Sequence, residues 1–230
     1  MRRALFVILA LVVMAVGALP AGAAEGRLIY LPVGKAVAEV DGIETALDAP
    51  ANIVGGRTLV PLRFISESLG ATVGWDGMER KVSIGLGSRS VEIWIDKVEA
   101  RVNGESQMLD VPPIIQNDRT MVPIRFVTEN LGLVVGWDNQ NRAVYVVSGQ
   151  PSNVVFIQDF AFGQAKGRAG QPLVFINLDS AEHTVTAKDM RFDSGELKLG
   201  WAYTLKLEKN GNYAIFCDYH PAMTATVVIE

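Results

Sequence analysis

Residues that bind soft metal ions gather near the C-terminal end of the chain. The stretch "CDYHPAM", residues 217–223, holds Cys217, His220 and Met223, and Cys217 is the only cysteine among the 230 residues. His183, in "SAEHTVT", is the other of the two histidines. A buried cysteine or methionine is more often a core residue than a ligand. Here all the histidine and cysteine falls within one short part of the chain, which indicates a metal site.

Two imidazoles and a thiolate in one plane, with a methionine as a weak axial ligand, form the ligand set of blue-copper sites. Cys217 ends a predicted strand, and the short loop after it can turn His220 and Met223 back toward the same ion. His183 comes from a separate strand end, 34 residues upstream of Cys217. Zinc is the alternative metal, but a thioether is a poor zinc ligand and structural zinc sites use several cysteines. The residues favour copper.

The elements that must position these ligands are predicted strands. Between residues 153 and 230, short segments of alternating polarity are separated by turn signals such as "DSGELKLG" and "KNGN". This pattern is typical of an all-β Greek-key sandwich, and no long helix is expected there.

Residues 153–230 resemble the plastocyanin and amicyanin family of cupredoxins. The likeness is carried by "AGQPLVFINLDSAEHTVT" and by the segment from "FDSGELKLG" through "CDYHPAM" to the last residue. It implies one type 1 copper ion, held by His183, Cys217, His220 and Met223, and one-electron transfer. Thr184 follows the first histidine where plastocyanins have Asn, and no ligand is missing.

The middle of the chain is duplicated. Residues 56–84, "GRTLVPLRFISESLGATVGWDGMERKVSI", match residues 118–146, "DRTMVPIRFVTENLGLVVGWDNQNRAVYV", at an offset of 62. Such self-similarity at a fixed period marks a repeated structural unit. Each unit predicts a strand, then a helix that starts at a proline, at residues 61–69 and 123–131, and then a hairpin. We expect the two units to pack about a pseudo-two-fold axis, because one alone buries too little apolar surface.

The motifs "RTLVPLRFISESLGATVGWD" and "RTMVPIRFVTENLGLVVGWD" resemble the copper amine oxidase N-terminal-like, or stalk, domain. The likeness covers residues 31–147, with repeats at about 31–86 and 91–147. It implies a non-catalytic α+β module of secreted and cell-surface bacterial proteins. Trp75 and Trp137 are expected to be core residues, with a ligand platform as the alternative. Residues 25–150 contain no His or Cys, so no transition-metal site is expected there.

The two predicted domains meet at a short linker. In "VSGQPSNV", residues 147–154, Gly, Pro, Ser and Asn interrupt the strand pattern, and we place the linker at residues 148–152. The expected fold is therefore multidomain: an α+β duplicated stalk domain followed by an all-β cupredoxin sandwich.

The N-terminal end is typical of a secretory signal peptide. Arg2 and Arg3 precede an apolar run and a small-residue site, so residues 1–24 are predicted to be removed near Ala23 or Ala24. An uncleaved anchor is the alternative, although the run is short for a membrane span. Cleavage leaves 19 basic and 25 acidic residues without a basic cluster, and we expect no nucleic-acid partner.

We therefore expect a secreted, cell-surface carrier of single electrons. With four ligands the metal has no open position for a substrate, so the protein is not expected to be an enzyme. A redox partner protein is expected to dock near His220, and the stalk domain could attach the protein to the cell surface or cell wall. The alternatives are a copper-delivery protein and a surface interaction protein in which the copper is incidental.

Overall fold

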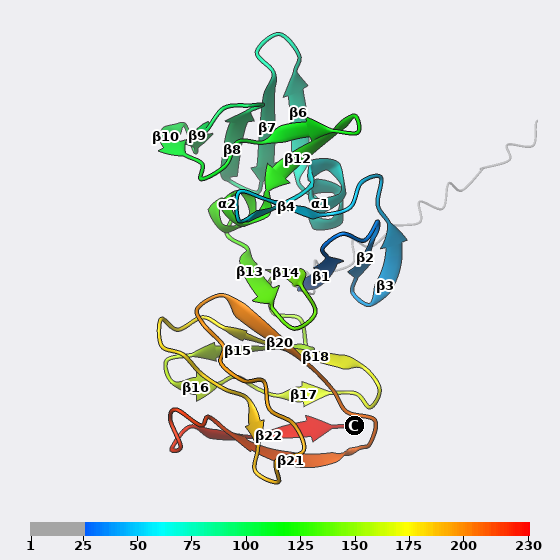
Figure 1. Ribbon diagram of the computed structural model, residues 1–230, viewed down its shortest axis with the longest axis vertical. Helices are drawn as coiled ribbons and strands as arrows, with labels where there is room; N and C mark the ends of the chain where they lie inside the picture. Colours follow the sequence, from blue (N-terminus) through cyan, green and yellow to red (C-terminus); the bar gives the residue numbers. More distant parts are fainter. Residues whose placement is uncertain (1–25) are drawn as a thin grey trace, which may run out of the picture.

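The structure, a computed structural model, describes residues 26–230, which consist mostly of β-strands with two short helices (Figure 1). None of the helices in these residues is long and apolar enough to cross a membrane. The predicted signal peptide, residues 1–24, lies outside the described residues.

Every strand of the first repeat has a counterpart 62 residues later. The first set is β1 (Arg27–Pro32), β2 (Val37–Val40), β3 (Ile43–Ala46), β4 (Asn52–Val54), β5 (Arg57–Pro61), β6 (Thr72–Asp76) and β7 (Lys81–Leu86). The second set is β8 (Arg89–Trp94), β9 (Glu99–Val102), β10 (Glu105–Met108), β11 (Ile114–Gln116), β12 (Arg119–Pro123), β13 (Val134–Asp138) and β14 (Ala143–Ser148).

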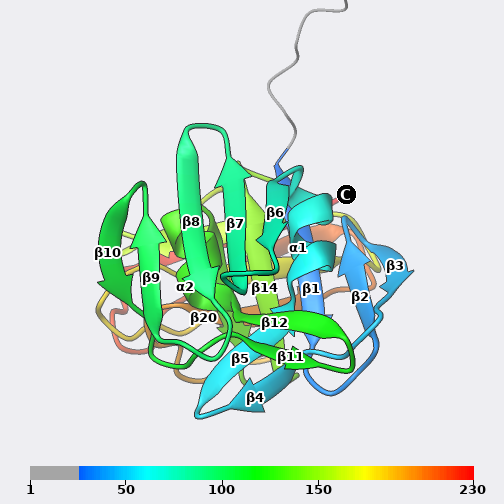
Figure 2. The same ribbon diagram turned by 90° about the horizontal axis from the view of Figure 1, so that it is seen from above.

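The two repeats exchange strands. One five-stranded sheet has the order β10-β9-β8-β7-β6, and the equivalent series β13-β14-β1-β2-β3 forms one end of a nine-stranded sheet. Strand β7 pairs with β8 of the other repeat, and β1 pairs with β14 along six residues. Figure 2 shows β6 to β10 side by side, with β4, β5, β11 and β12 running across them. Each sheet is therefore complete only when both repeats are present.

The two helices begin directly after a proline. Helix α1 (Leu62–Leu69) and helix α2 (Ile124–Asn130) each start one residue later than predicted. Pro61 and Pro123 are the last residues of β5 and β12, and their extended ψ values of 114° and 104° make them N-caps. The fixed φ of proline suits both the strand and the helix. Helix α1 ends at Gly70, whose φ of 69° is the left-handed conformation that glycine adopts at low cost.

The repeats are related by an approximate two-fold axis between β5 and β12. These strands pair antiparallel in the four-stranded sheet β11-β12-β5-β4, with Val60 opposite Val122, the residue 62 positions later. Both valines are fully buried. Both repeats contribute residues to the main hydrophobic core of this region, among them Ile65 of α1 and Val127 of α2.

The C-terminal part consists of two sheets that face each other. Residues such as Phe175, Ile157, Ile215 and Val227 fill the space between the sheets. The first sheet is the other end of the nine-stranded sheet, in the order β16-β15-β18-β20, and the second has the order β17-β22-β21-β19. The strands are β15 (Val154–Gln158), β16 (Ala161–Phe162), β17 (Lys166–Gly167), β18 (Pro172–Asn177), β19 (Thr186–Ala187), β20 (Trp201–Lys206), β21 (Gly211–Phe216) and β22 (Thr224–Ile229).

A parallel pairing of β13 with β20 joins the two parts into one sheet. Trp137 lies opposite Trp201, and the backbone N–H of Trp137 donates to the carbonyl of Gly200 at 2.8 Å. In Figure 1, β13 and β14 lie between the two parts of the molecule. The sheet thus continues from the part before the predicted linker, residues 148–152, into the part after it.

Candidate metal centre

Three of the four predicted ligands meet in the C-terminal part. The ligand atoms of His183, Cys217 and His220 all lie within 4.8 Å of one another. The Sγ of Cys217 is 3.7 Å from Nδ1 of His183 and 3.6 Å from Nδ1 of His220. His183 and Cys217 are fully buried, whereas His220 is partly exposed. The site therefore has a closed side toward the core and an edge toward solvent at His220.

Two separate loops bring these side chains together. His183 lies between β18 and β19, where its N–H and carbonyl form a two-way bridge with Leu197 at 3.1 and 2.8 Å. Cys217 directly follows β21, and the loop from there to β22 is closed by its own backbone. The N–H of His220 donates to Cys217, that of Met223 to His220, and that of Cys217 to Met223, at 3.2, 2.8 and 3.1 Å. These three bonds are all made within the backbone of the loop itself.

Met223 is placed in the same loop as Cys217 and His220. It is 6% exposed and belongs to the same buried cluster as Cys217. The backbone bonds described above hold it between the cysteine strand and the start of β22. Its role as an axial ligand stays a prediction.

Asp179 orients the buried histidine, and the sequence reasoning did not find it. Its Oδ2 lies 3.0 Å from Nε2 of His183. A carboxylate only accepts, so Nε2 carries the proton and Nδ1 keeps its lone pair toward Cys217. Burial raises the pKa of Asp179, but the backbone N–H groups of Phe160 and Asp159 and the ring of His183 lower it, and the net pKa lies below the usual range. The only sequence signal is the spacing of four residues between Asp179 and His183.

Thr184 links the two ligand loops. Its backbone N–H donates to Sγ of Cys217 at 3.3 Å, and its Oγ1 accepts from the N–H of Asp218 at 2.9 Å. The same hydroxyl lies 2.8 Å from Oγ1 of Thr186. Thr184 thus ties the histidine loop to the cysteine loop through its backbone and its side chain. Although plastocyanins have Asn at this position, Thr184 still connects the two loops.

Phe160 covers the exposed edge of the site, and it was not predicted either. Its ring meets the ring of His183 edge-on at 5.4 Å and that of His220 at 4.9 Å, and it is 56% exposed. Asp159 and Phe160 both have φ of 55°, which is uncommon for residues other than glycine. Asp179 accepts from both of their N–H groups, at 2.8 and 3.0 Å. One carboxylate therefore holds both the buried histidine and the aromatic cover.

The spacing of these atoms fits a first-row metal ion. Such an ion lies about 2.0–2.1 Å from imidazole nitrogen and about 2.3 Å from thiolate sulfur, which separates sulfur from nitrogen by about 3.6–3.8 Å at trigonal or tetrahedral angles. The two observed separations, 3.7 and 3.6 Å, agree with this value. Among residues 26–230, no other His, Cys, Asp and Glu side chains form such a group.

The repeat region differs from expectation at one tryptophan. Trp137 is partly buried, but Trp75 is 53% exposed, so the prediction that it is a core residue is wrong. The reason is that Trp137 has a neighbour in β20, whereas β6, which carries Trp75, is the last strand of its sheet.

Comparison with known proteins gives two likenesses, one for each part of the chain. The family model of the copper amine oxidase N-terminal domain matches residues 22–84 and 39–146. Solved structures of amicyanin mutants are similar to the C-terminal region: one in the oxidised state at 25% identity, one in the reduced state at 26% and one in the Cu(I) form at 27%. Each of the three matches covers 34% of this chain and 80% of the amicyanin chain, with a TM-score of 0.32. A search of the curated proteins finds no match.

Proposed function

Because the chain belongs to the copper amine oxidase N-terminal domain family through its repeats, and carries its His–Cys–His cluster outside them, we propose a blue-copper electron carrier. Residues 153–230 are the Greek-key cupredoxin domain of this proposal, and residues 31–147 are its α+β stalk. The observation that carries the proposal is the position of Sγ of Cys217, 3.6–3.7 Å from two imidazole Nδ1 atoms.

The donor set favours copper over zinc. One thiolate, two imidazoles and the thioether of Met223 suit copper, whereas a thioether is a poor zinc ligand and structural zinc sites use several cysteines. When bound, copper would supply one-electron exchange between Cu(II) and Cu(I). His183, Cys217 and His220 would hold it, with Met223 as the fourth ligand. This leaves no position for a substrate, so the protein is proposed to be a carrier and not an enzyme.

The residues around the ligands suit a site that keeps one geometry in both oxidation states. Asp179 holds the ring of His183, Thr184 joins the two loops, and the loop backbone is bonded to itself. His220 is the ligand that reaches the surface, so we place the docking of the redox partner there. Secretion and attachment to the cell surface through the stalk complete the proposal.

One experiment tests the proposal directly. The protein of residues 25–230 is loaded with Cu(II), and its visible absorption is compared with that of Cys217→Ser. We expect an intense band from charge transfer between thiolate and copper, which the serine variant lacks because a hydroxyl cannot supply the easily oxidised sulfur. A colourless wild type, or a band that survives in Cys217→Ser, contradicts the proposal.

A second measurement separates an electron carrier from a copper-delivery protein. We expect a reversible reduction potential and fast electron self-exchange, without loss of the ion to a chelator on the same time scale. Rapid transfer of copper to the chelator would instead favour delivery.

A further inference from the structure

The four-residue motif "VGWD" occurs in two different environments. It lies at residues 135–138 in β13, where it contacts the C-terminal part, and at residues 73–76 in β6, where its edge has no neighbouring strand in residues 26–230. All five residues of β6 are exposed, with Val73 at 45% and Trp75 at 53%. Their counterparts are more buried, with Val135 at 5%. The motif is the same in both places, so the difference comes from the elements that pack against each copy, and β20 is one of them for β13.

The contact of β13 with β20 uses each feature of the motif. Trp137 pairs with Trp201 and donates its N–H to Gly200. A Cβ on Gly136 would lie 3.1 Å from Cβ of Ala202, so the missing side chain permits the close approach. The third feature is the aspartate of the motif, which is 1% exposed and accepts from Oγ1 of Thr204 at 2.9 Å.

Strand β6 carries the same three residues, Gly74, Trp75 and Asp76, without a strand beside them in residues 26–230. Gly74 has only Ser83 of its own sheet near its would-be Cβ, at 3.8 Å, so the space that Ala202 fills beside Gly136 is open here. The Oδ1 of Asp76 accepts from the N–H groups of Met78 and Glu79, as Oδ1 of Asp138 accepts in the matching turn.

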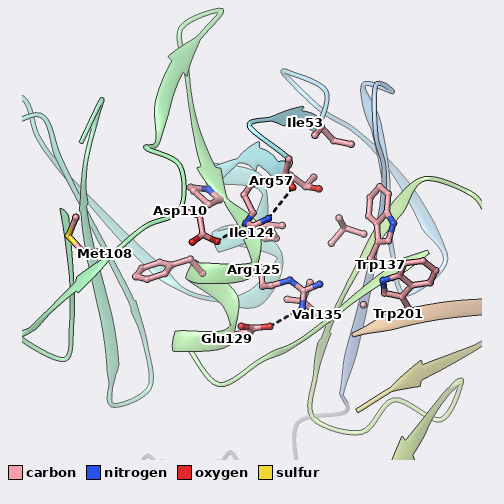
Figure 3. Close-up of a pocket in the computed structure, with 16 residues that line it drawn as sticks. Ile53, Arg57, Met108, Asp110, Ile124, Arg125, Glu129, Val135, Trp137 and Trp201 are labelled. Carbon is pink, nitrogen blue, oxygen red and sulfur yellow. Dashed lines mark hydrogen bonds and ion pairs between the residues drawn. The ribbon is translucent and has the colours of Figure 1, made fainter. Parts of the chain in front are cut away.

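The pockets beside the two motifs show the same relation. Figure 3 shows Trp137 and Trp201 side by side at one end of a pocket of about 700 Å³. The equivalent pocket of about 740 Å³ is lined by Trp75 and has no counterpart of Trp201. One wall, supplied in the first pocket by β20, is therefore missing in the second.

We propose that β6 is a second docking edge, which binds an edge strand from a β-sandwich domain of another protein. The strand would add in parallel with the side-chain pattern of β20: an aromatic residue opposite Trp75, then a small residue, and a hydroxyl residue two positions later. A second copy of this chain does not supply that strand, because its β20 is already paired on both sides by β13 and β18. Strand β6 also lacks the Lys or Pro that often protects an edge.

The test uses the protein of residues 25–230 and a synthetic peptide of residues 198–206 with blocked ends. The N–H of Trp75 is the reporter, because the N–H of Trp137 makes the equivalent bond to Gly200 at 2.8 Å. We expect saturating peptide to slow hydrogen exchange of the Trp75 amide at least about tenfold, as measured by NMR. A peptide with Thr204→Val should bind roughly tenfold more weakly, because it lacks the hydroxyl for Asp76.

Matched variants decide whether the peptide uses this edge. Gly74→Val should abolish the protection, because its side chain fills the space that the small residue needs. Ser106→Val, on β10 at the other end of the same sheet, should retain it. Val73→Lys blocks the same edge by another change and replaces Gly74→Val if that variant does not fold. The proposal is overturned if Trp75 exchange is unchanged, if both blocking variants stay protected, or if Trp75 is protected without peptide in a dimer seen by sedimentation.

Discussion

At the scale of single residues, Asp179 connects three parts of the candidate metal centre without being a predicted ligand. It accepts from Nε2 of His183 and from the N–H groups of Asp159 and Phe160. Its side chain is only 13% exposed and His183 is fully buried, so water replaces the bond between them poorly. Carboxylates that hold a metal-binding histidine set both its tautomer and its orientation.

We expect Asp179→Ala to lower copper affinity about 10- to 100-fold, because His183 is no longer oriented. The free energy of unfolding should also fall by about 1–3 kcal/mol, since the buried ring N–H of His183 loses its acceptor. Competition with a chelator and denaturant unfolding measure the two effects. Asp189→Ala is the control, because Asp189 pairs only with Arg191 in an exposed ion pair. Equal copper affinity in the two variants would show that Asp179 does not position the ligand.

At the scale of elements, the repeats provide a matched pair of glycines in β6 and β13. A Cβ at position 136 meets Ala202 at 3.1 Å and Ile176 at 3.2 Å, whereas one at position 74 meets only Ser83, at 3.8 Å. The two glycines share a local sequence, so they differ mainly in the element that lies against them.

Gly136→Val should therefore lower the free energy of unfolding by about 1–3 kcal/mol, as overpacking in a closed interface does. Gly74→Val should change it by less than about 0.5 kcal/mol, because exposed positions tolerate substitution. Chemical denaturation of both variants makes the comparison. Equal losses would mean that the cost comes from the strand itself and not from β20.

Strand exchange predicts that a single repeat does not fold. A fragment of residues 25–88 keeps β1 and β7 but lacks β14 and β8, with which they pair. We expect no cooperative thermal transition and poor dispersion of its NMR spectrum. A monomeric fragment that unfolds cooperatively would contradict this.

At the scale of the whole molecule, a buried polar chain crosses the junction of the two parts. The hydroxyl of Tyr145 donates to Thr204 at 2.7 Å, and Thr204 donates to Asp138 at 2.9 Å. Burial raises the pKa of Tyr145; the bond to Thr204 lowers it, the charge of Asp138 raises it, and the net pKa lies above its usual range. A tyrosinate here would be desolvated and close to a carboxylate.

The raised pKa predicts a loss of stability in alkali. A group whose pKa is higher in the folded state stabilises the fold fully below its unfolded pKa, about 10 for tyrosine, and this contribution is lost as the pH rises above that value. Tyr145→Phe should cost about 1 kcal/mol at pH 7 through the lost hydrogen bond. Between pH 10 and 11 its stability should fall less steeply than that of wild type, as measured by denaturation at each pH. Parallel curves would exclude Tyr145 as the cause.

The sequence by itself determined the features that depend on local spacing. The repeat of 62 residues, the helices after Pro61 and Pro123, and the alternation of the C-terminal strands are all read from neighbouring residues. The repeat also identified the copper amine oxidase N-terminal domain family, and the match to the model of that family confirms it. The candidate ligands could be found because His183, Cys217 and His220 are the only residues of their types, and the structure brings these three together.

Only the tertiary structure decided which strands meet. The exchange between repeats, the pairing of β13 with β20 and the cover of Phe160 over His220 join residues that are far apart in the sequence. Identical motifs then acquire different surroundings, so Trp75 is exposed while Trp137 is partly buried. Local propensity is the same for both tryptophans, and their burial depends on which strand lies against them.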